Sequence, residues 1–135
     1  MASKKIICDT DVMVDYWNVK NPRHLATKKI LEDSIGFDNI VLSAITKMEL
    51  LVGARNKSDL SKINKNLDPV FIALINNEIT QASFSLIQKY TLSHGLALPD
   101  GMIAATAIIT GLELFTYNLC DYQFIPELVL FRPAI

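Results

Sequence analysis

Cysteine and histidine are scarce in this chain, which has two of each among its 135 residues. Cys8 and Cys120 have no metal-ligand spacing, and each lies beside apolar residues, so we expect two reduced, partly buried thiols. His24 and His94 are isolated from each other, which argues against a zinc site. No Ser–His or Cys–His pair stands out, so nothing in the chain points to a nucleophilic triad.

Glycine-rich loops, long apolar runs and excess charge are lacking as well. The five glycines form no phosphate-binding loop, and the formal net charge of -1 provides no global basic field for a nucleic acid. No apolar run approaches the ~18 residues of a membrane-spanning helix. Near the N-terminus, Lys4 and Lys5 precede only three apolar residues before Asp9, which is too few for a signal peptide. We therefore expect a cytoplasmic protein that contacts no membrane.

The chain does have enough apolar residues for a core. Half of its residues are hydrophobic, and 135 residues is a usual length for one domain. It contains no internal repeat, linker or low-complexity tract, which predicts a single domain over residues 1–135. The mean hydropathy of +0.28 is high for a soluble monomer of this size and suggests surface reserved for a partner.

Strand-like and helix-like segments alternate along the chain. Short apolar runs predict strands at 6–8, 40–42, 70–73, 114–116 and 129–131. Helices are expected at 11–17, 22–34, 44–55, 59–66, 78–93 and 101–110, with caps at Asn21, Ser43, Ser58, Asn77 and Asp100. This alternation predicts an α/β fold with a parallel sheet, in which every strand points its carboxyl end to the same edge.

Four carboxylates fall where such a fold would gather them. Asp9 ends the first strand, and Asp121 closely follows another apolar run. Glu49 stands among apolar neighbours in a helix, where a buried carboxylate needs a partner. Asp100 precedes a helix of small residues that can pack closely on the sheet. Carboxylates gathered in this way repel each other unless a hard cation lies among them, so we predict a Mg²⁺ or Mn²⁺ site.

The polar neighbours of these acids have both ordinary and functional explanations. The run Asp9-Thr10-Asp11 can be an Asx turn that closes a strand and caps a helix. Alternatively, Thr10 can orient a metal-bound water. Thr46 lies three residues before the helical glutamate and shares its face. Asn118, just past a strand, is either an ordinary turn residue or a hydrogen-bond partner of the carboxylates.

Basic residues cluster once, between the glutamate-bearing helix and the strand at 70–73. The cluster consists of Arg55, Lys57, Lys62 and Lys65. The simple explanation is a solvated helix face. The functional one is a patch that holds a phosphate backbone near the acids, with Arg55 and Lys57 as the expected contacts.

Four segments in series carry a family resemblance: Asp9-Thr10-Asp11, the run 43–53 centred on Glu49, the run 98–107 and the run 118–122. Each motif alone is weak, but the four occur in order and span nearly the whole chain. Together they resemble the PIN-domain ribonucleases, and among these the VapC toxins of toxin–antitoxin systems. Asp11 stands where such toxins commonly have Asn, and Tyr122 stands where they often have Phe.

The resemblance implies a three-layer α/β/α sandwich around a short parallel sheet, with the four acids binding Mg²⁺ or Mn²⁺. It also implies an RNA substrate, a homodimer, and a small antitoxin protein that plugs the site. Thr116 and Asn118 match accessory polar positions of the family.

Metal-assisted hydrolysis of RNA is the mechanism we expect on these grounds. Asp9 and Asp100 are the expected direct ligands, and Glu49 and Asp121 complete the site directly or through water. An activated water would attack phosphorus in line with the leaving 3′ oxygen, without using the ribose 2′ hydroxyl. The products would therefore carry a 5′ phosphate and a 3′ hydroxyl.

Three alternatives remain open on the sequence. A PIN nuclease of RNA maturation would look similar. A phosphatase of the haloacid-dehalogenase type would use Asp9 as a nucleophile, but Met13 stands where that family has Thr or Val. A receiver-like or metal-binding interaction module would hold a cation without catalysis.

Overall fold

Four short parallel strands form the central sheet of the protein, whose computed structural model describes residues 4–133. The strands are β1 (Ile6–Cys8), β2 (Ile40–Ser43), β3 (Phe71–Ala73) and β4 (Glu113–Phe115), in the spatial order β3-β2-β1-β4. Every neighbouring pair is parallel, and Ile7 is paired with both Val41 and Leu114. The carboxyl ends of all four strands therefore meet at one edge of the sheet.

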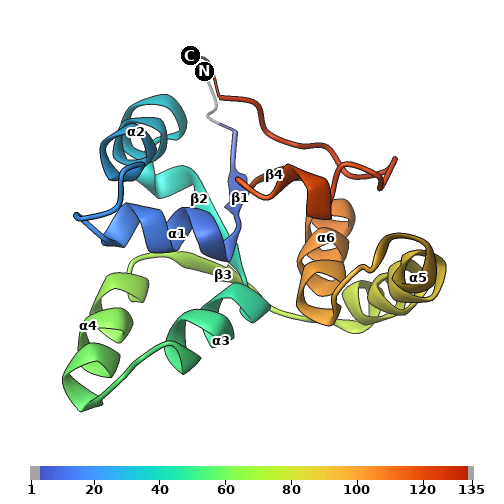
Figure 1. The fold of residues 1–135 in the computed structure, drawn as a ribbon, viewed down its shortest axis with the longest axis horizontal. Helices are drawn as coiled ribbons and strands as arrows, with labels where there is room; N and C mark the ends of the chain where they lie inside the picture. The colour runs from blue at the N-terminus through green and yellow to red at the C-terminus, as the bar shows by residue number, and fades with distance from the viewer. Residues whose placement is uncertain (1–3, 134–135) are drawn as a thin grey trace.

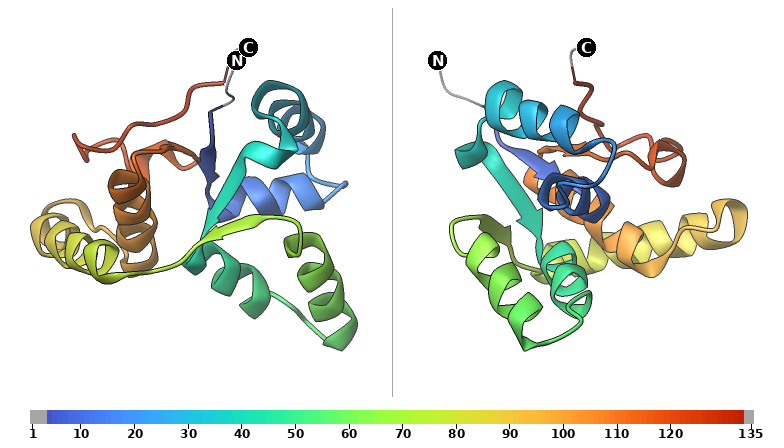
Figure 2. Two further views of the ribbon diagram at one scale, coloured as in Figure 1. Left: turned by 180° about the vertical axis from the view of Figure 1, so that it is seen from behind. Right: turned by 60° about the vertical axis from the view of Figure 1, so that its left-hand side comes forward.

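Helices cover both faces of this sheet (Figure 1, Figure 2). One face carries α1 (Thr10–Trp17), α2 (His24–Lys29) with its π-helical continuation η1 (Ile30–Ile35), and α4 (Lys57–Leu67). The other face carries α5 (Asn77–His94) and α6 (Leu98–Thr110). Helix α3 (Ala44–Val52) follows β2 directly, and two 3-10 turns are η2 (Phe37–Asn39) and η3 (Leu119–Asp121). The predicted α/β/α sandwich is confirmed.

Alternate strand residues divide the hydrophobic core into two clusters, one on each face of the sheet. Ile7 and Val41 pack on the α5–α6 side, and Ile6 and Ile40 pack on the α1–η1 side. All four are at most 2% exposed. Burial on both faces is the usual state of parallel strands, and it explains why these strands read as continuous apolar runs.

Three predicted helix ends are confirmed: the N-terminal cap of α3 and the C-terminal glycines of α5 and α6. The Ser43 side chain caps α3, because its Oγ accepts hydrogen bonds from the backbone N of Ile45 at 3.0 Å and of Thr46 at 3.3 Å. Gly95 and Gly111 end α5 and α6 with φ angles of 67° and 71°, in the left-handed region that glycine adopts without steric cost.

Two other predicted caps are off by one or two residues. Asn56, not Ser58, caps α4, and Asn76, not Asn77, caps α5. Each asparagine Oδ1 accepts a hydrogen bond from the backbone N three residues later, at 2.8 Å and 2.9 Å respectively. In both places two or more polar residues precede the helix, and the tertiary path of the loop selects among them.

The predicted start of the second helix is also corrected. Asn21 and Pro22 lie in a turn, where Asn21 Oδ1 accepts a hydrogen bond from the backbone N of Arg23 at 2.8 Å, and α2 begins only at His24. Asp100 is likewise no cap, because α6 begins at Leu98 after Ala97, with Pro99 in the first turn. The Asp100 side chain is thus not engaged in capping.

The predicted strand at 129–131 is reduced to a single bridge. Leu130 pairs with Leu114, supported by hydrogen bonds from Leu114 N to Val129 O at 2.9 Å and from Phe131 N to Leu114 O at 2.8 Å. Pro126 and Pro133 flank this segment and lack the donors that a longer ladder would need.

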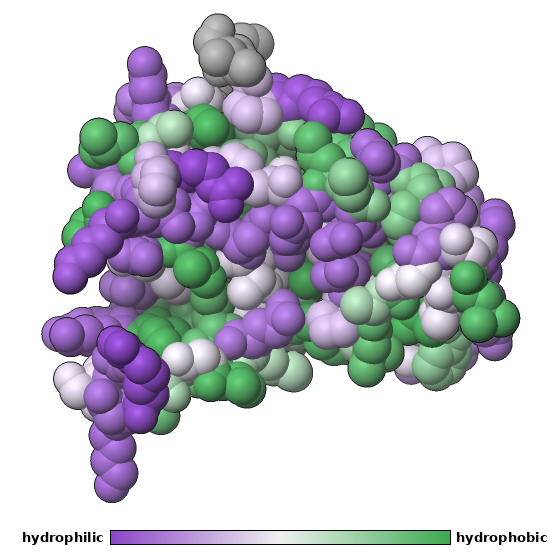
Figure 3. All heavy atoms as spheres, viewed as in Figure 1, coloured by the Kyte–Doolittle hydropathy of each residue, from purple (hydrophilic) through white to green (hydrophobic). Residues whose placement is uncertain are grey.

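Hydrophilic and hydrophobic side chains are mixed on the face of the molecule drawn in Figure 3, with hydrophilic chains projecting at its left, over α2 and α4. Within residues 4–133, no helix has both the length and the apolar character needed to span a membrane.

The two thiols differ from each other. Both are free, but Cys8 is fully buried in β1 and Cys120 is exposed in η3. The expectation of two partly buried thiols is therefore wrong for each. Burial raises the pKa of the Cys8 thiol, and the charges of Asp9 and Asp11 add to the rise, so Cys8 is an inert core residue.

Candidate active site

A cleft of about 340 Å³ opens at the carboxyl edge of the sheet. It is bounded by the end of β1 and the first half of α1, by α3, by the first turn of α6 and by the segment after β4. Its lining residues are Asp9, Thr10, Asp11, Val14, Asp15, Glu49, Asp100 and Asn118. The fold thus brings three of the four predicted acids to one hollow, although Asp9 and Asp100 are 91 residues apart in the chain.

Asp9 is the most firmly held of these acids. Its backbone N donates to Phe115 O at 2.9 Å, and its side chain is buried, with 5% of the residue exposed. Thr116 Oγ1 donates to Asp9 Oδ2 at 2.8 Å, and the backbone N of Thr10 donates to Oδ1 at 2.7 Å. The backbone N of Asn118 in turn donates to Thr116 Oγ1 at 3.0 Å. The loop after β4 therefore orients the hydroxyl that fixes the Asp9 carboxylate.

Asp100 lies in the first turn of α6, where the helix dipole favours a negative charge. The hydroxyl of the buried Tyr122 donates to Asp100 Oδ1 at 3.1 Å. The small residues of this helix are buried as expected, and a Cβ on Gly101 would lie 2.9 Å from a side-chain carbon of Ile87 in α5. This close packing holds the turn that carries Asp100.

Glu49 is exposed, contrary to the expectation of a largely buried helix face. Its neighbours Met48 and Val52 are exposed too. Glu49 nevertheless has the partner that the sequence called for, because Thr10 Oγ1 donates to Glu49 Oε1 at 2.7 Å. The hydroxyl of Thr46, one turn earlier on α3, lies 3.1 Å from the same Thr10 hydroxyl. Both threonines therefore position this carboxylate.

Asp121 is the acid that the structure sets apart. It is exposed in η3 and does not line the cleft. It is still close enough to act electrostatically, because its charge contributes to the raised pKa of Asp100. Among the four predicted acids, Asp121 thus lies at the periphery.

The acids raise one another's affinity for protons. Burial raises the pKa of Asp9, and the charge of Glu49 adds to the rise, while hydrogen bonds oppose it. Burial, followed by the charges of Asp9, Asp121 and Glu49, raises the pKa of Asp100 to about 6. Burial and the charge of Asp9 also raise the pKa of Asp11 to about 6. Such mutual raising is typical of carboxylates that share a cation site.

Asp11 and Asp15 line the cleft although neither was predicted as a site residue. Asp11 Oδ2 accepts a hydrogen bond from the backbone N of Tyr117 at 3.0 Å, and its Oδ1 accepts from Val12 N at 2.8 Å. Asp15 lies one helical turn after Asp11, on the same face of α1. The four-residue spacing of the two acids in a predicted helix was the signal that could have indicated Asp15 as a neighbour of Asp11.

The donor set fits a hard divalent cation in chemistry. It consists of carboxylate oxygens with hydroxyl and amide groups around them, which Mg²⁺ and Mn²⁺ prefer. The described residues contain no ready-made group of three His, Cys, Asp or Glu side chains at metal-binding distances. Mg²⁺ often retains several of its waters and binds carboxylates through them, so not every acid has to touch the ion.

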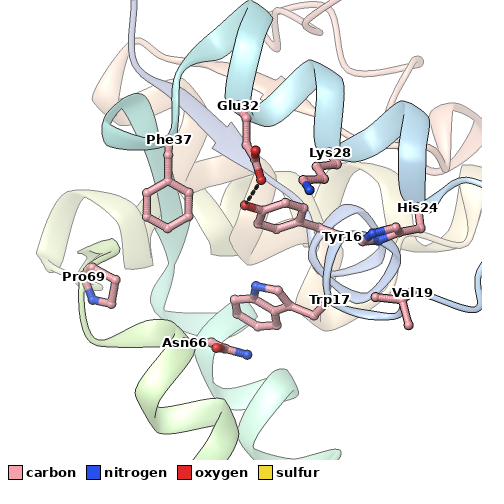
Figure 4. A pocket seen from close by; sticks show the side chains of 9 residues that line it. All are labelled: Tyr16, Trp17, Val19, His24, Lys28, Glu32, Phe37, Asn66 and Pro69. Atoms are coloured by element: carbon pink, nitrogen blue, oxygen red, sulfur yellow. Dashed lines mark hydrogen bonds between the residues drawn. The ribbon is translucent and has the colours of Figure 1, made fainter.

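A larger hollow of about 480 Å³ lies elsewhere, beside the end of α1, the α2–η1 segment and the end of α4 (Figure 4). Tyr16, Trp17 and Phe37 form much of its wall. Its one carboxylate, Glu32, accepts a hydrogen bond from the Tyr16 hydroxyl at 2.8 Å, and Lys28 lies nearby. This hollow therefore lacks the acid cluster of a metal site.

The predicted basic contacts lie outside the cleft. Arg55 follows α3 and is exposed, with its Nε 3.0 Å from Asp59 Oδ2, and Lys57 is exposed at the start of α4. This ion pair lowers the pKa of the Asp59 carboxyl. Neither side chain is among the residues that line the cleft.

The family model of the PIN domain matches residues 6–119 of this chain, which include Asp9, Glu49 and Asp100. The chain belongs to the PIN-domain family. The resemblance that the motifs indicated is thereby confirmed.

Individual proteins are similar to this chain along nearly their whole length. Ribonuclease VapC19 of Mycobacterium tuberculosis is 27% identical over 123 residues, which cover 90% of this chain and 95% of the relative. A chain of a toxin–antitoxin complex from Klebsiella pneumoniae superposes with a TM-score of 0.75 and 29% identity, over 96% of this chain and 100% of that one. FitAcB from Neisseria gonorrhoeae gives 0.72 and 28%, over 95% and 97%.

Proposed function

We propose that this PIN domain is a VapC-type ribonuclease, the toxin of a toxin–antitoxin pair, which hydrolyses RNA phosphodiester bonds with Mg²⁺ or Mn²⁺. The observation that carries the proposal is the cleft, where Asp9, Glu49 and Asp100 come from three separate elements to one hollow. The similarity to a ribonuclease and to a chain of a toxin–antitoxin complex supports the same activity and role.

Asp9 and Asp100 are the proposed direct ligands of the cation, and Glu49 and Asp121 complete the site directly or through water. A divalent cation bound there would supply positive charge for the scissile phosphate and acidify a water molecule. Asp9 presents oxygens that Thr116 and the backbone already orient. This order reduces the entropy lost when the site binds its ligands.

The proposed reaction is hydrolysis at phosphorus. Water attacks in line with the 3′ oxygen, the P–O3′ bond breaks, and a proton returns to the leaving oxygen. The described cleft contains no histidine that could instead deprotonate the ribose 2′ hydroxyl. The products are expected to carry a 5′ phosphate and a 3′ hydroxyl, and 2′,3′-cyclic phosphate ends would contradict the mechanism.

A cognate antitoxin and a second copy of this chain are the proposed partners. A chain similar to this one comes from a toxin–antitoxin complex. The described surface also leaves large apolar side chains exposed, including Val52, Leu74 and Leu92, which suit protein interfaces. A monodisperse monomer, with no gain in melting temperature from the antitoxin, would contradict this part of the proposal. Arg55 and Lys57 remain proposed as outer contacts with the RNA backbone.

Cleavage of a mixed RNA pool by the purified protein tests the activity. Reactions contain Mg²⁺, Mn²⁺ or EDTA, with the Asp9→Asn protein in parallel. We expect metal-dependent cutting that falls by about a thousandfold or more in Asp9→Asn, since the metal supplies several kcal/mol of transition-state stabilisation. Circular dichroism of the variant shows whether the fold is retained.

The alternatives predict different results in the same set of assays. Hydrolysis of a simple phosphomonoester would favour the phosphatase, and metal binding without cleavage of any RNA would favour the interaction module. Growth arrest on expression, reversed by the cognate antitoxin, distinguishes a toxin from a nuclease of RNA maturation.

A further inference from the structure

The residues that line the cleft carry an excess of negative charge. Its lining includes Asp9, Asp11, Asp15, Glu49 and Asp100, and no lysine or arginine is found among the described residues that line it. Two divalent cations carry less charge than five carboxylates, and RNA adds one negative charge per phosphate. A fixed cation at the rim would therefore be needed to hold the backbone.

Arg23 stands immediately before α2, where its side chain makes no capping hydrogen bond, and it contacts Asp15 in the lining of the cleft. Its Nε lies 2.7 Å from Asp15 Oδ2, and its guanidinium carbon lies 4.3 Å from the centroid of the Tyr117 ring. The Asp15 side chain is 5% exposed, whereas that of Arg23 is 53% exposed. The ion pair is close but not aligned as a hydrogen bond, since Asp15 Oδ2 has no hydrogen-bond partner among the described residues.

Tyr117 contacts both the Arg23 guanidinium and Asp11 of the cleft. Its hydroxyl lies 2.6 Å from Thr27 Oγ1 on α2, and its backbone N donates to Asp11 Oδ2 at 3.0 Å. The ring under Arg23 is therefore anchored at one end to the helix and at the other to the cleft. Within residues 4–133, neither terminal nitrogen of Arg23 donates a hydrogen bond, so both can bind a ligand.

We propose that Arg23 is the residue that binds the RNA backbone at this cleft, by holding a phosphate beside the scissile one through its two terminal nitrogens. The inference rests on the proposed function and assigns a positioning residue to it. A planar guanidinium pairs with two phosphate oxygens at once, which an ammonium group cannot do. The contacts with Asp15 and Tyr117 hold the side chain in place before RNA arrives.

The competing explanation is that Arg23 only neutralises the buried Asp15. Two variants separate the two roles: Asp15→Asn, which retains Arg23, and Asp15→Asn combined with Arg23→Gln. The double variant leaves no unpaired buried charge, so it avoids the main cause of misfolding. Lys29→Gln is the matched control, because Lys29 is exposed on the same helix and carries the same charge.

Binding of a short fluorescent single-stranded RNA with Mg²⁺ is measured by anisotropy at several salt concentrations, in the non-cleaving Asp9→Asn background. Between Asp15→Asn and the double variant, we expect a roughly tenfold rise in Kd and a salt slope smaller by about 0.7, the value for one phosphate contact on a single strand. Lys29→Gln should change Kd by less than about twofold. Arg23→Lys should keep the salt slope and lose part of the affinity.

Equal Kd and slope in the two Asp15→Asn proteins would overturn the proposal, as would an equal loss from Lys29→Gln. In the double variant, a loss of affinity without a change in slope would also overturn it, because Arg23 would then act through packing alone. If the double variant fails to fold, Arg23→Lys decides by affinity: a partial loss with the slope kept supports the two-nitrogen contact, and an unchanged Kd overturns it. RNA cleavage by the unsubstituted protein, with no effect at Arg23, refutes only this inference, whereas an unsubstituted protein that neither binds nor cuts RNA refutes the proposed function as well.

Discussion

The two sides of the acid cleft are built differently. On one side, Asp9 and Asp11 leave the end of β1 and the start of α1, and each accepts two hydrogen bonds from backbone or hydroxyl donors. On the other side, Glu49 is exposed and is held by a single threonine hydroxyl, and Asp121, which is also exposed, lies outside the cleft. The difference suggests that one side fixes the position of a cation and that the other adjusts to the cation and its RNA.

Removing a donor from the fixed side should have the largest effect of the substitutions that leave all four acids in place. Thr116→Val deletes the hydroxyl that orients the buried Asp9 carboxylate, and we expect metal-dependent RNA cleavage to fall about 10- to 100-fold. Thr106→Val is the control, since the hydroxyl of this buried threonine donates to the backbone O of Met102 within its own helix. Initial rates at saturating Mg²⁺ are compared, and equal losses in the two variants would mean that the Asp9 contact has no special role.

Substitutions on the adjustable side should cost less and should be graded. We expect Glu49→Gln to lower cleavage by about tenfold, and Asp121→Asn, outside the cleft, by only a few-fold. Because an adjustable ligand acts through metal affinity, raised Mn²⁺ should restore part of the lost rate in both. Rates measured across a Mn²⁺ titration check this. A larger loss in Asp121→Asn than in Glu49→Gln would reverse the proposed assignment of the two sides.

The smallest expected effect concerns stability without metal. The pKa values of Asp11 and Asp100 are about 6 in the folded protein, above the ordinary value of 3.8 that applies when unfolded. The folded state therefore holds these protons more tightly, and the resulting stabilisation is complete below about pH 4 and lost as pH rises through about 6.

Melting in EDTA at a series of pH values measures this contribution. Both carboxyls are partly exposed, so solvent screens the penalty, and we expect these two groups to lower Tm by about 3–5 °C between pH 4.5 and pH 7.5. Asp100→Asn should flatten part of the difference, and Mg²⁺ at pH 7.5 should raise Tm of the unsubstituted protein. An unchanged pH dependence of Tm in Asp100→Asn would show that the pKa of this carboxyl is not raised in the folded protein.

The main elements of the fold were predictable because their signals are local. Continuous apolar runs mark β1 and β2, and glycines in the left-handed region end α5 and α6. Errors arose where several polar residues competed for one role. Asn56 caps α4 in place of the predicted Ser58, and Asn76 caps α5 in place of Asn77. Helix α6 begins at Leu98, with Pro99 in its first turn, so Asp100 lies inside the helix.

The candidate site was predictable to the extent that it follows from strand direction. Asp9 lies at the carboxyl end of a parallel strand, and its neighbours at that edge could be expected from topology. Exposure could not be read from neighbours along the chain, as Glu49 shows, since apolar Met48 and Val52 are exposed whereas Leu50 is buried. Asp15 and Arg23 were missed because their significance depends on a contact between α1 and the start of α2.

By itself, the amino-acid sequence determined the alternation of strands and helices, the parallel sheet and the acids at its edge, because hydrophobic period, caps and strand direction act over a few residues. Only the tertiary structure decided which acids are buried, which hydroxyl orients Asp9, that Asp121 lies outside the cleft, and which arginine reaches its wall. Those properties depend on distances and solvent access between segments far apart in the chain, and packing alone fixes them.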